Sequence, residues 1–228
     1  MGTLYIVATP IGNLGDISQR ALRALAEVDL ILCEDTRVSK KLLDHYQIKT
    51  PSLSYHQYSK LQKIEQVISL LEKSKNLALI SDAGTPGISD PGNLLIKEVI
   101  RKLGNKVKVV PVPGPSAITA ATGISGFPMD KFLFLGFPPT KKKRKKFFEE
   151  IINSKYPVVF YESPHRIIKT LKELELETKA YSLQPKIVVC RELTKKFETI
   201  YRGIIREVIK QIEKDIIKGE FVVIIDKD

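Results

Sequence analysis

Several residue types are scarce in this sequence. It has no tryptophan and only two methionines, two cysteines and three histidines in 228 residues. Cys33 and Cys190 lack the Cys-x-x-Cys spacing of a zinc site, and two such residues make no disulfide framework. Both end apolar runs, so we interpret them as buried thiols. Because His45, His56 and His165 are equally dispersed, the sequence predicts no metal site.

Long apolar runs are also missing. None approaches the ~20 residues that a transmembrane helix needs. The first residues read as a short strand stopped by Thr9-Pro10, which is unlike a signal peptide. Ile6 stands where a myristoylation motif needs Ser or Thr. We therefore expect a cytoplasmic protein without a membrane partner. Neither a P-loop nor a Rossmann glycine pattern is present.

Acidic residues are few relative to basic ones. The sequence has 37 Lys and Arg against 26 Asp and Glu, a net charge of +11. This surplus favours a polyanionic partner, with nucleic acid first and an acidic small molecule second. The run Lys141–Lys146 indicates that the charge is clustered. It could contact phosphates from a mobile loop, or be an ordinary solvated surface.

An apolar fraction of 43% is enough for a core, and its distribution predicts an α/β fold. Short apolar runs alternate with stretches of helical periodicity in both halves of the chain. We expect two α/β domains, residues 1–122 and 123–228, with a ligand cleft between them. The expected strands are Thr3–Ala8, Leu30–Cys33, Pro51–Ser54, Leu77–Ile80, Val107–Val112, Lys131–Leu135, Pro157–Tyr161, Ile187–Cys190 and Glu220–Ile225.

Three expected strands of the first half end in loops rich in Gly and Pro: Thr9–Asp16, Ser81–Gly92 and Pro113–Ser116. In a parallel sheet these ends share one edge, where ligands bind. Gly allows close backbone approach and Pro stiffens a loop. The loops suit an adenosyl or nucleotide-like ligand better than a metal. For Ser81–Gly92, which ends with the helix-start signal Asp90-Pro91, the alternative is a plain turn without function.

Charged residues follow other expected strands, in Glu34–Arg37, Glu162–Arg166 and Arg191–Lys196. They indicate the rim of a pocket. Helix capping explains part of them, because Asp35 or Thr36 can cap a helix and Ser163-Pro164 fits a cap followed by the first helical position. Ion pairing across the domain interface is the alternative for the rest.

Taken in order along the chain, these motifs resemble those of bacterial small-subunit ribosomal RNA (cytidine-2′-O)-methyltransferases, a family of the tetrapyrrole-methylase superfamily. The resemblance is carried by Val7–Ser18, Cys33–Arg37, Ser81–Gly92, Pro113–Ala117, Tyr161–Arg166 and Arg191–Lys195. It implies two α/β domains that bind the methyl donor S-adenosyl-L-methionine in the cleft between them, usually in a homodimer. The implied donor contacts are Pro10, Ile11, Asp82, Thr85, Ser116, Ala117 and Tyr161.

The resemblance also implies a reaction. A methyl group passes to the 2′-hydroxyl of a cytidine in the decoding region of 16S rRNA, either naked or in the small ribosomal subunit. No DNA and no metal take part. A base beside the hydroxyl would help, and the candidates are Glu162 or Glu34, with His165 as the alternative. The residues expected to hold phosphates or lower the pKa of the hydroxyl are Arg37, Arg166, Arg191 and Lys195.

Two other functions remain open from the sequence. The same fold could methylate a carbon of a tetrapyrrole, or the protein could be a ribosome-assembly factor that binds RNA without catalysis. The sequence also departs from the family pattern. Gly136-Phe137-Pro138-Pro139 stands where the family usually has Gly-Phe-Leu-Pro, and familiar members continue past the last strand into a small helical extension. We therefore expect Lys141–Lys146 and a dimer surface to matter more for RNA.

Overall fold

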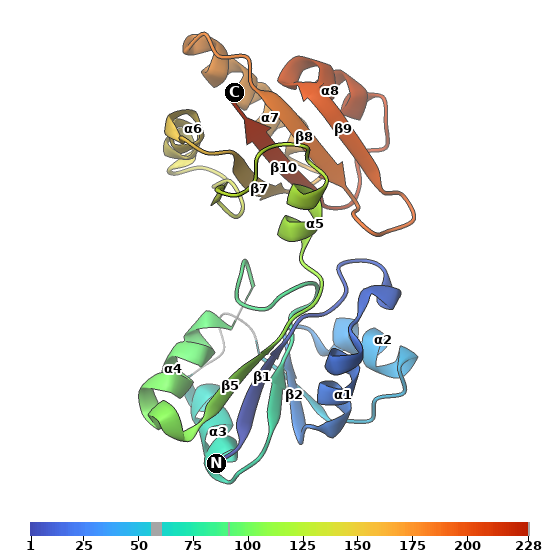
Figure 1. Ribbon diagram of the computed structural model, residues 1–228, viewed down its shortest axis with the longest axis vertical. Helices are drawn as coiled ribbons and strands as arrows, with labels where there is room; N and C mark the ends of the chain where they lie inside the picture. Colours follow the sequence, from blue (N-terminus) through green and yellow to red (C-terminus); the bar gives the residue numbers. More distant parts are fainter. Residues whose placement is uncertain (56–60, 91, 228) are drawn as a thin grey trace. The chain divides into compact units, whose positions relative to one another are not determined.

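The computed structural model describes residues 1–55, 61–90 and 92–227 and divides the chain into two compact units. The first is Met1–Ser116 and the second is Ala117–Asp228 (Figure 1). His56 and Pro91, named above, lie outside the described residues. Within the described part of the chain, no helix is long and apolar enough to cross a membrane.

The first unit contains a five-stranded parallel sheet, as predicted. The strand order is β3-β2-β4-β1-β5, and each neighbouring pair is parallel. The strands are β1 (Thr3–Val7), β2 (Leu30–Cys33), β3 (Ser52–Ser54), β4 (Leu77–Leu79) and β5 (Lys108–Val112).

Helices cover both faces of this sheet (Figure 1). The connection from β1 to β2 skips β4 in the strand order, and the connection from β4 to β5 skips β1 in the opposite direction. Because such crossovers are right-handed, the two directions place their helices on opposite faces, and two separate apolar cores result. The helices are α1 (Gln19–Glu27) and α2 (Thr36–His45) on one face, and α3 (Leu61–Glu72) and α4 (Asn93–Leu103) on the other.

Side chains cap two helices of the first unit, and the cap expected at a third is wrong. The Ser18 hydroxyl accepts the N–H of Ala21 at 3.1 Å and caps α1. Asp35 caps α2, with its carboxylate 2.8 Å from the Arg37 N–H. The cap of α4 is Gly92 rather than Asp90.

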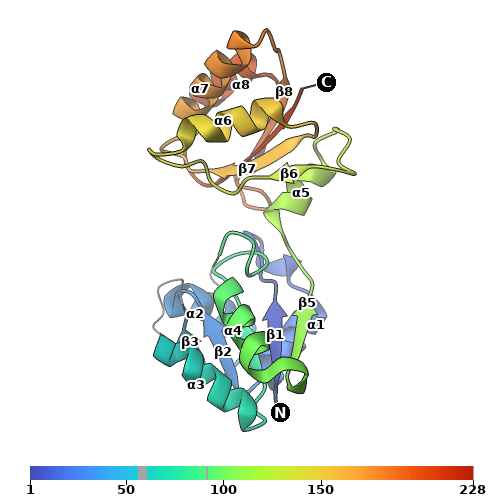
Figure 2. The same cartoon turned by 90° about the vertical axis from the view of Figure 1, so that its left-hand side faces the viewer.

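The second unit contains a mixed five-stranded sheet in the order β6-β7-β10-β8-β9. Figure 2 shows β6 beside β7. The β6–β7 pair is parallel and the other pairs are antiparallel. The strands are β6 (Leu133–Phe134), β7 (Val158–Glu162), β8 (Lys186–Arg191), β9 (Thr199–Ile204) and β10 (Phe221–Asp226). The sequence analysis did not anticipate β9, whose Gly203 and exposed Arg202 weaken the apolar pattern of a strand.

Three helices of the second unit pack on one face of its sheet and enclose a core around Phe160 and Phe221. They are α6 (Arg144–Asn153), α7 (Ile167–Ala180) and α8 (Ile205–Glu213). The short helix α5 (Ala117–Gly123) contacts β10. Cys33 in the first unit and Cys190 in the second are buried, as predicted.

The basic run Lys141–Lys146 is not wholly a loop, which was one of the two alternatives from the sequence, because α6 begins within it. Arg144 is only 12% exposed. Its guanidinium donates to the Glu173 carboxylate at 2.5 Å and to the Thr170 hydroxyl at 2.8 Å. Arg144 therefore holds α6 against α7, whereas the five lysines of the run are exposed.

Two glycines allow a matched test of packing. A Cβ at the buried Gly2 would overlap the backbone carbonyl of Lys75, whereas a Cβ at Gly123 would meet no heavy atom within 4 Å. We expect Gly2→Ala to lower the free energy of unfolding by about 2–3 kcal/mol, because backbone must move. Gly123→Ala should leave it unchanged or raise it by up to about 1 kcal/mol. Urea denaturation checks both; equal effects would contradict the packing described.

Candidate functional site

Four loops of the first unit lie side by side at the carboxyl edge of its sheet, because they follow the neighbouring strands β2, β4, β1 and β5. The chain leaves β1 toward one face of the sheet and leaves β4 toward the other. Loops that part in this way open a crevice, and ligands of open α/β sheets bind at such a point. The loops are residues 8–12, 34–35, 80–90 and 113–116.

The loops after β1 and β4 are joined by a short antiparallel bridge. The Thr9 N–H donates to the Gly84 carbonyl at 2.9 Å, and the Gly84 N–H donates back at 3.1 Å. The Thr9 hydroxyl, in a residue only 2% exposed, donates to the Ser81 carbonyl at 3.2 Å. Thr9 therefore holds the loop after β1 against the loop after β4, at the point where the two loops diverge.

Close packing ties the loop after β5 to the same bridge. The Thr85 hydroxyl donates to the Pro115 carbonyl at 3.2 Å. Gly84 has φ +80°, and a Cβ there would lie 3.3 Å from the Ile11 side chain. A Cβ at Gly114 would lie 3.1 Å from the Ala8 methyl group. The three Gly/Pro loops predicted to meet at one edge thus form one interlocked surface.

Carboxylates gather where the loops after β2 and β4 meet. The exposed Asp82 accepts the Asp35 N–H at 3.0 Å. Beside them, the pKa of Glu34 is raised, first by burial and then by the negative charges of Asp82, Asp90 and Asp35. Glu34 therefore keeps its proton to a higher pH than an ordinary glutamate.

The side chain of Arg37 forms an ion pair with Asp35, two residues before it. Its guanidinium lies 2.6 Å from the Asp35 carboxylate and is 89% exposed. Hydrogen bonds from the Arg37 side chain and then its N–H lower the pKa of Asp35 to about 2. This pair closes the first turn of α2 and presents a cation to solvent.

In the second unit, Glu162 at the end of β7 lies within a network of hydrogen bonds. Its side chain is 0% exposed and lies 2.8 Å from the Arg166 guanidinium. Its two oxygens also accept the Ser163 N–H at 2.7 Å and the Thr170 hydroxyl at 2.6 Å. Arg166 donates further to the Pro138 carbonyl at 3.0 Å. Thr170 has no counterpart in the motifs, so the sequence analysis missed it.

This network also corrects the predicted start of α7. Ser163 precedes a turn formed by Pro164, His165 and Arg166, and the cap of the helix is Arg166. The Ser163 carbonyl accepts the N–H groups of Arg166 and Ile167 at 3.1 and 3.0 Å. The turn leaves His165 exposed.

Arg191 and Lys195 are held by a second group of charges, after β8. Arg191 is 7% exposed; it donates to the Lys218 carbonyl at 2.9 Å and to Asp215 at 3.0 Å. Lys195 binds the carboxylates of Glu192 and Glu220 at 2.8 and 2.9 Å. Glu192 and Thr194 have positive φ, 53° and 65°. The ion pairs therefore hold a loop in a conformation that non-glycine residues rarely adopt.

The two charged motifs of the second unit share one edge of its sheet. Phe221 of β10 pairs with Glu162 on one side and with Arg191 on the other. Tyr161 precedes Glu162 and packs its ring edge-on to Phe134, with centroids 5.0 Å apart. Ala117 opens α5. The predicted cleft between the two domains stays a prediction.

In the part of the chain that the structure describes, no group of three or more His, Cys, Asp or Glu side chains could hold a metal ion. The residues predicted for donor binding divide between the units. Five of them lie on the first, and its loops bring them to one edge: Pro10, Ile11, Asp82, Thr85 and Ser116.

The chain is similar in sequence to known proteins over nearly its whole length. The chain is 44% identical to the ribosomal RNA small subunit methyltransferase I of Thermotoga maritima, over 99% of this chain and 98% of that protein. It is 46% identical to the protein of that name from Vibrio cholerae, over 97% of this chain and 76% of the relative. The protein of that name from Synechocystis is 41% identical, over 99% of this chain and 79% of the relative. The relatives thus differ in length.

Solved structures share the fold at low identity. A cobalt precorrin-4 methyltransferase has a TM-score of 0.71 at 17% identity, over 98% of this chain and 94% of the other. A diphthine synthase has a TM-score of 0.72 at 14% identity, over 99% and 90%. The family model of the tetrapyrrole (corrin/porphyrin) methylases matches residues 3–209. With the interlocked loops and two α/β units, this match means that the chain belongs to the tetrapyrrole methylase family.

Proposed function

We propose that this protein transfers a methyl group from S-adenosyl-L-methionine to the 2′-hydroxyl of a cytidine in 16S rRNA. The observation that carries the proposal is the high identity, over nearly the whole chain, to relatives named for methylation of small-subunit ribosomal RNA. The tetrapyrrole enzymes share the fold at far lower identity. The net charge of +11 fits an RNA partner.

The interlocked loops fit the methyl donor. They offer backbone groups, an apolar side chain at Ile11 and a carboxylate at Asp82 that is exposed and accepts one backbone N–H. The bound donor would supply an electrophilic methyl group on its sulfonium. The residues that would hold it are Pro10, Ile11, Asp82, Thr85, Ser116, Ala117 and Tyr161. Their rigidity matters because positioning contributes much of the rate of such a transfer.

Glu34 is better suited than Glu162 to accept the proton of the ribose hydroxyl. A base must come within hydrogen-bond reach of the proton that it takes. Glu162 is buried and already bound to Arg166 and Thr170. Glu34 is half-buried, and its raised pKa makes it a stronger base than an ordinary carboxylate. The exposed His165 is the alternative.

The cations then have separate roles. Glu162 positions Arg166, and Arg191 and Lys195 fix the loop after β8. Arg37 is the most exposed of the four and is suited to hold a phosphate. The exposed lysines of Lys141–Lys146 add unspecific attraction for RNA. We propose a homodimer in the cytoplasm, as the resemblance implies, acting on naked rRNA or on the assembled small subunit.

The reaction can be tested with methyl-labelled donor and three acceptors: small ribosomal subunits, naked 16S rRNA and a precorrin. We expect label in RNA, at one linkage that resists alkali, because a methylated 2′-oxygen cannot attack its phosphate. Label in the precorrin alone would favour the tetrapyrrole alternative. If calorimetry detects no saturable binding of the donor, the protein is not a methyltransferase. That result would favour a ribosome-assembly factor that binds RNA without catalysis.

The two glutamates can be separated by matched substitutions. We expect Glu34→Gln to lower the single-turnover rate about 10²–10⁴-fold, the usual contribution of a general base. The wild-type rate should rise with pH through a pKa above the ~4.3 of an unperturbed glutamate, because the base acts when deprotonated.

Glu162→Gln should instead lower the free energy of unfolding by about 3–5 kcal/mol, because it breaks a buried ion pair. Thermal unfolding and single-turnover rates at several pH values check both variants. A folded Glu162→Gln protein that binds the donor but has lost the reaction, beside an active Glu34→Gln protein, would reverse the assignment.

A further inference from the structure

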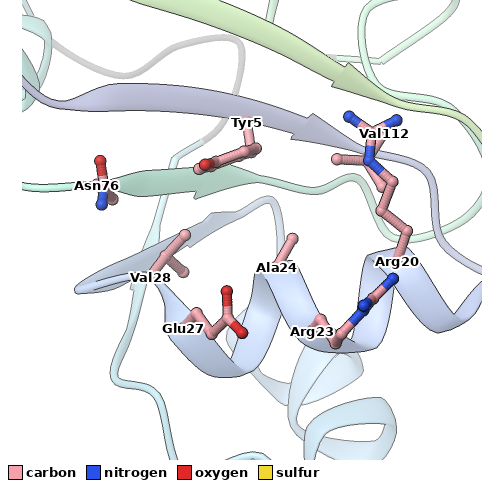
Figure 3. A pocket seen from close by; sticks show the side chains of 8 residues that line it. All are labelled: Tyr5, Arg20, Arg23, Ala24, Glu27, Val28, Asn76 and Val112. Atoms are coloured by element: carbon pink, nitrogen blue, oxygen red, sulfur yellow. The ribbon is translucent and has the colours of Figure 1, made fainter.

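A polar groove of about 260 Å³ lies on the first unit between α1 and the sheet (Figure 3). Tyr5 of β1 and Val112 of β5 belong to its lining. Arg20, Arg23 and Glu27 line it from α1, at positions i, i+3 and i+7 of one helix face. Val112 is the last residue of β5, so one end of the groove reaches the carboxyl edge of the sheet.

The topology explains why this place is open. Helix α1 contacts β1, and β5 is the edge strand beside it. After Val112 the chain continues into Pro113–Ser116 and the second unit, so the described part of the first unit has no further helix after β5. Beside α1, Val112 is buried but Tyr5 is only half-buried, and the side chain of Arg20 reaches toward Val112 (Figure 3).

The two guanidinium groups are not used by the fold. Unlike those of Arg144 and Arg191, the guanidinium groups of Arg20 and Arg23 form no hydrogen bond or ion pair with another residue in the described ranges. Two cations on adjacent turns repel each other unless an anion lies between them. A guanidinium is suited to a phosphate because its N–H groups match two phosphate oxygens at once.

The rest of the groove fits the other parts of a nucleotide. The Tyr5 side chain offers an aromatic face for stacking, and the Glu27 carboxylate and the Asn76 amide lie toward the other end (Figure 3). The volume is below the ~300–1,000 Å³ of sites for drug-sized ligands. This limits the occupant to a group of about one nucleotide.

A second copy of the chain fits this edge less well. Pro111 on β5 lacks an N–H, and Lys108 on the same strand is exposed. Both features oppose pairing with another strand.

Resting on the proposed function, we infer that this groove binds one nucleotide of the RNA substrate. Arg20 and Arg23 hold its phosphate and Tyr5 contacts the nucleoside. Because the groove starts at the edge that carries the donor-binding loops, the bound nucleotide would fix the register of the strand relative to the methylated position. This would be an RNA contact separate from the lysines of Lys141–Lys146.

The double variant Arg20→Ala/Arg23→Ala tests the inference, with binding to a 16S rRNA fragment followed by fluorescence anisotropy over a range of salt concentrations. We expect the affinity to fall about 10–100-fold. The slope of log affinity against log salt should decrease by about 0.7 for the lost phosphate contact. Steady-state kinetics should show a higher KM for RNA with kcat retained, and donor affinity and melting temperature should not change.

The matched control is Lys40→Ala/Lys41→Ala on α2, which removes two exposed charges from the same face of the same unit. It should weaken RNA binding far less. Arg20→Lys/Arg23→Lys keeps the charge but loses the planar donors, so it should fall between wild type and the alanine variant.

The outcomes separate this inference from the proposed function. If the wild-type enzyme is active and the groove variant binds RNA no worse than the lysine control, the inferred role of the groove is wrong and the proposed function stands. If the wild-type protein neither binds nor methylates RNA, both the inferred role of the groove and the proposed function are wrong. If sedimentation shows that the groove variant turns a dimer into monomers with unchanged RNA affinity, the surface is an interface between copies instead.

Discussion

The pair of hydrogen bonds between Thr9 and Gly84 joins two loops that the topology of the first unit separates. Strands β1 and β4 are neighbours, but their chains leave toward opposite faces of the sheet, which opens a gap between them. The bridge closes the base of that gap. The Gly/Pro loops beside it can therefore be rigid without being buried. Loops held in this way present their backbone N–H and C=O groups to a ligand.

Ionisable side chains near the strand ends divide into two kinds. Most are neutralised locally: Glu162 by Arg166, Lys195 by Glu192 and Glu220. These groups determine where loops lie. Glu34 is different, because its pKa is raised first by burial and then by the negative charges of neighbouring carboxylates. A group kept in an unfavourable electrostatic environment is a better candidate for chemistry than one whose charge is compensated.

Sequence patterns identified the strands and the loop edge because parallel strands are buried on both faces and read as continuous apolar runs. They could not identify the partners of the charged motifs. Thr170 is eight residues from Glu162, and Asp215 lies far along the chain from Arg191. Such pairs form only when helices and strands pack. Likewise, six basic residues in succession concealed that Arg144 faces inward, which depends on where α6 begins.

The sheet edge at β5 shows how one constraint can have two consequences. Since the chain passes from β5 into the second unit, the described part of the first unit has no helix that follows this strand. For stability this is a cost, because Tyr5 is left only partly buried. For binding it leaves a polar groove that reaches the carboxyl edge of the sheet, where the interlocked loops lie. Arginines that were needed only for solubility could point anywhere from α1, but Arg20 and Arg23 both line this groove.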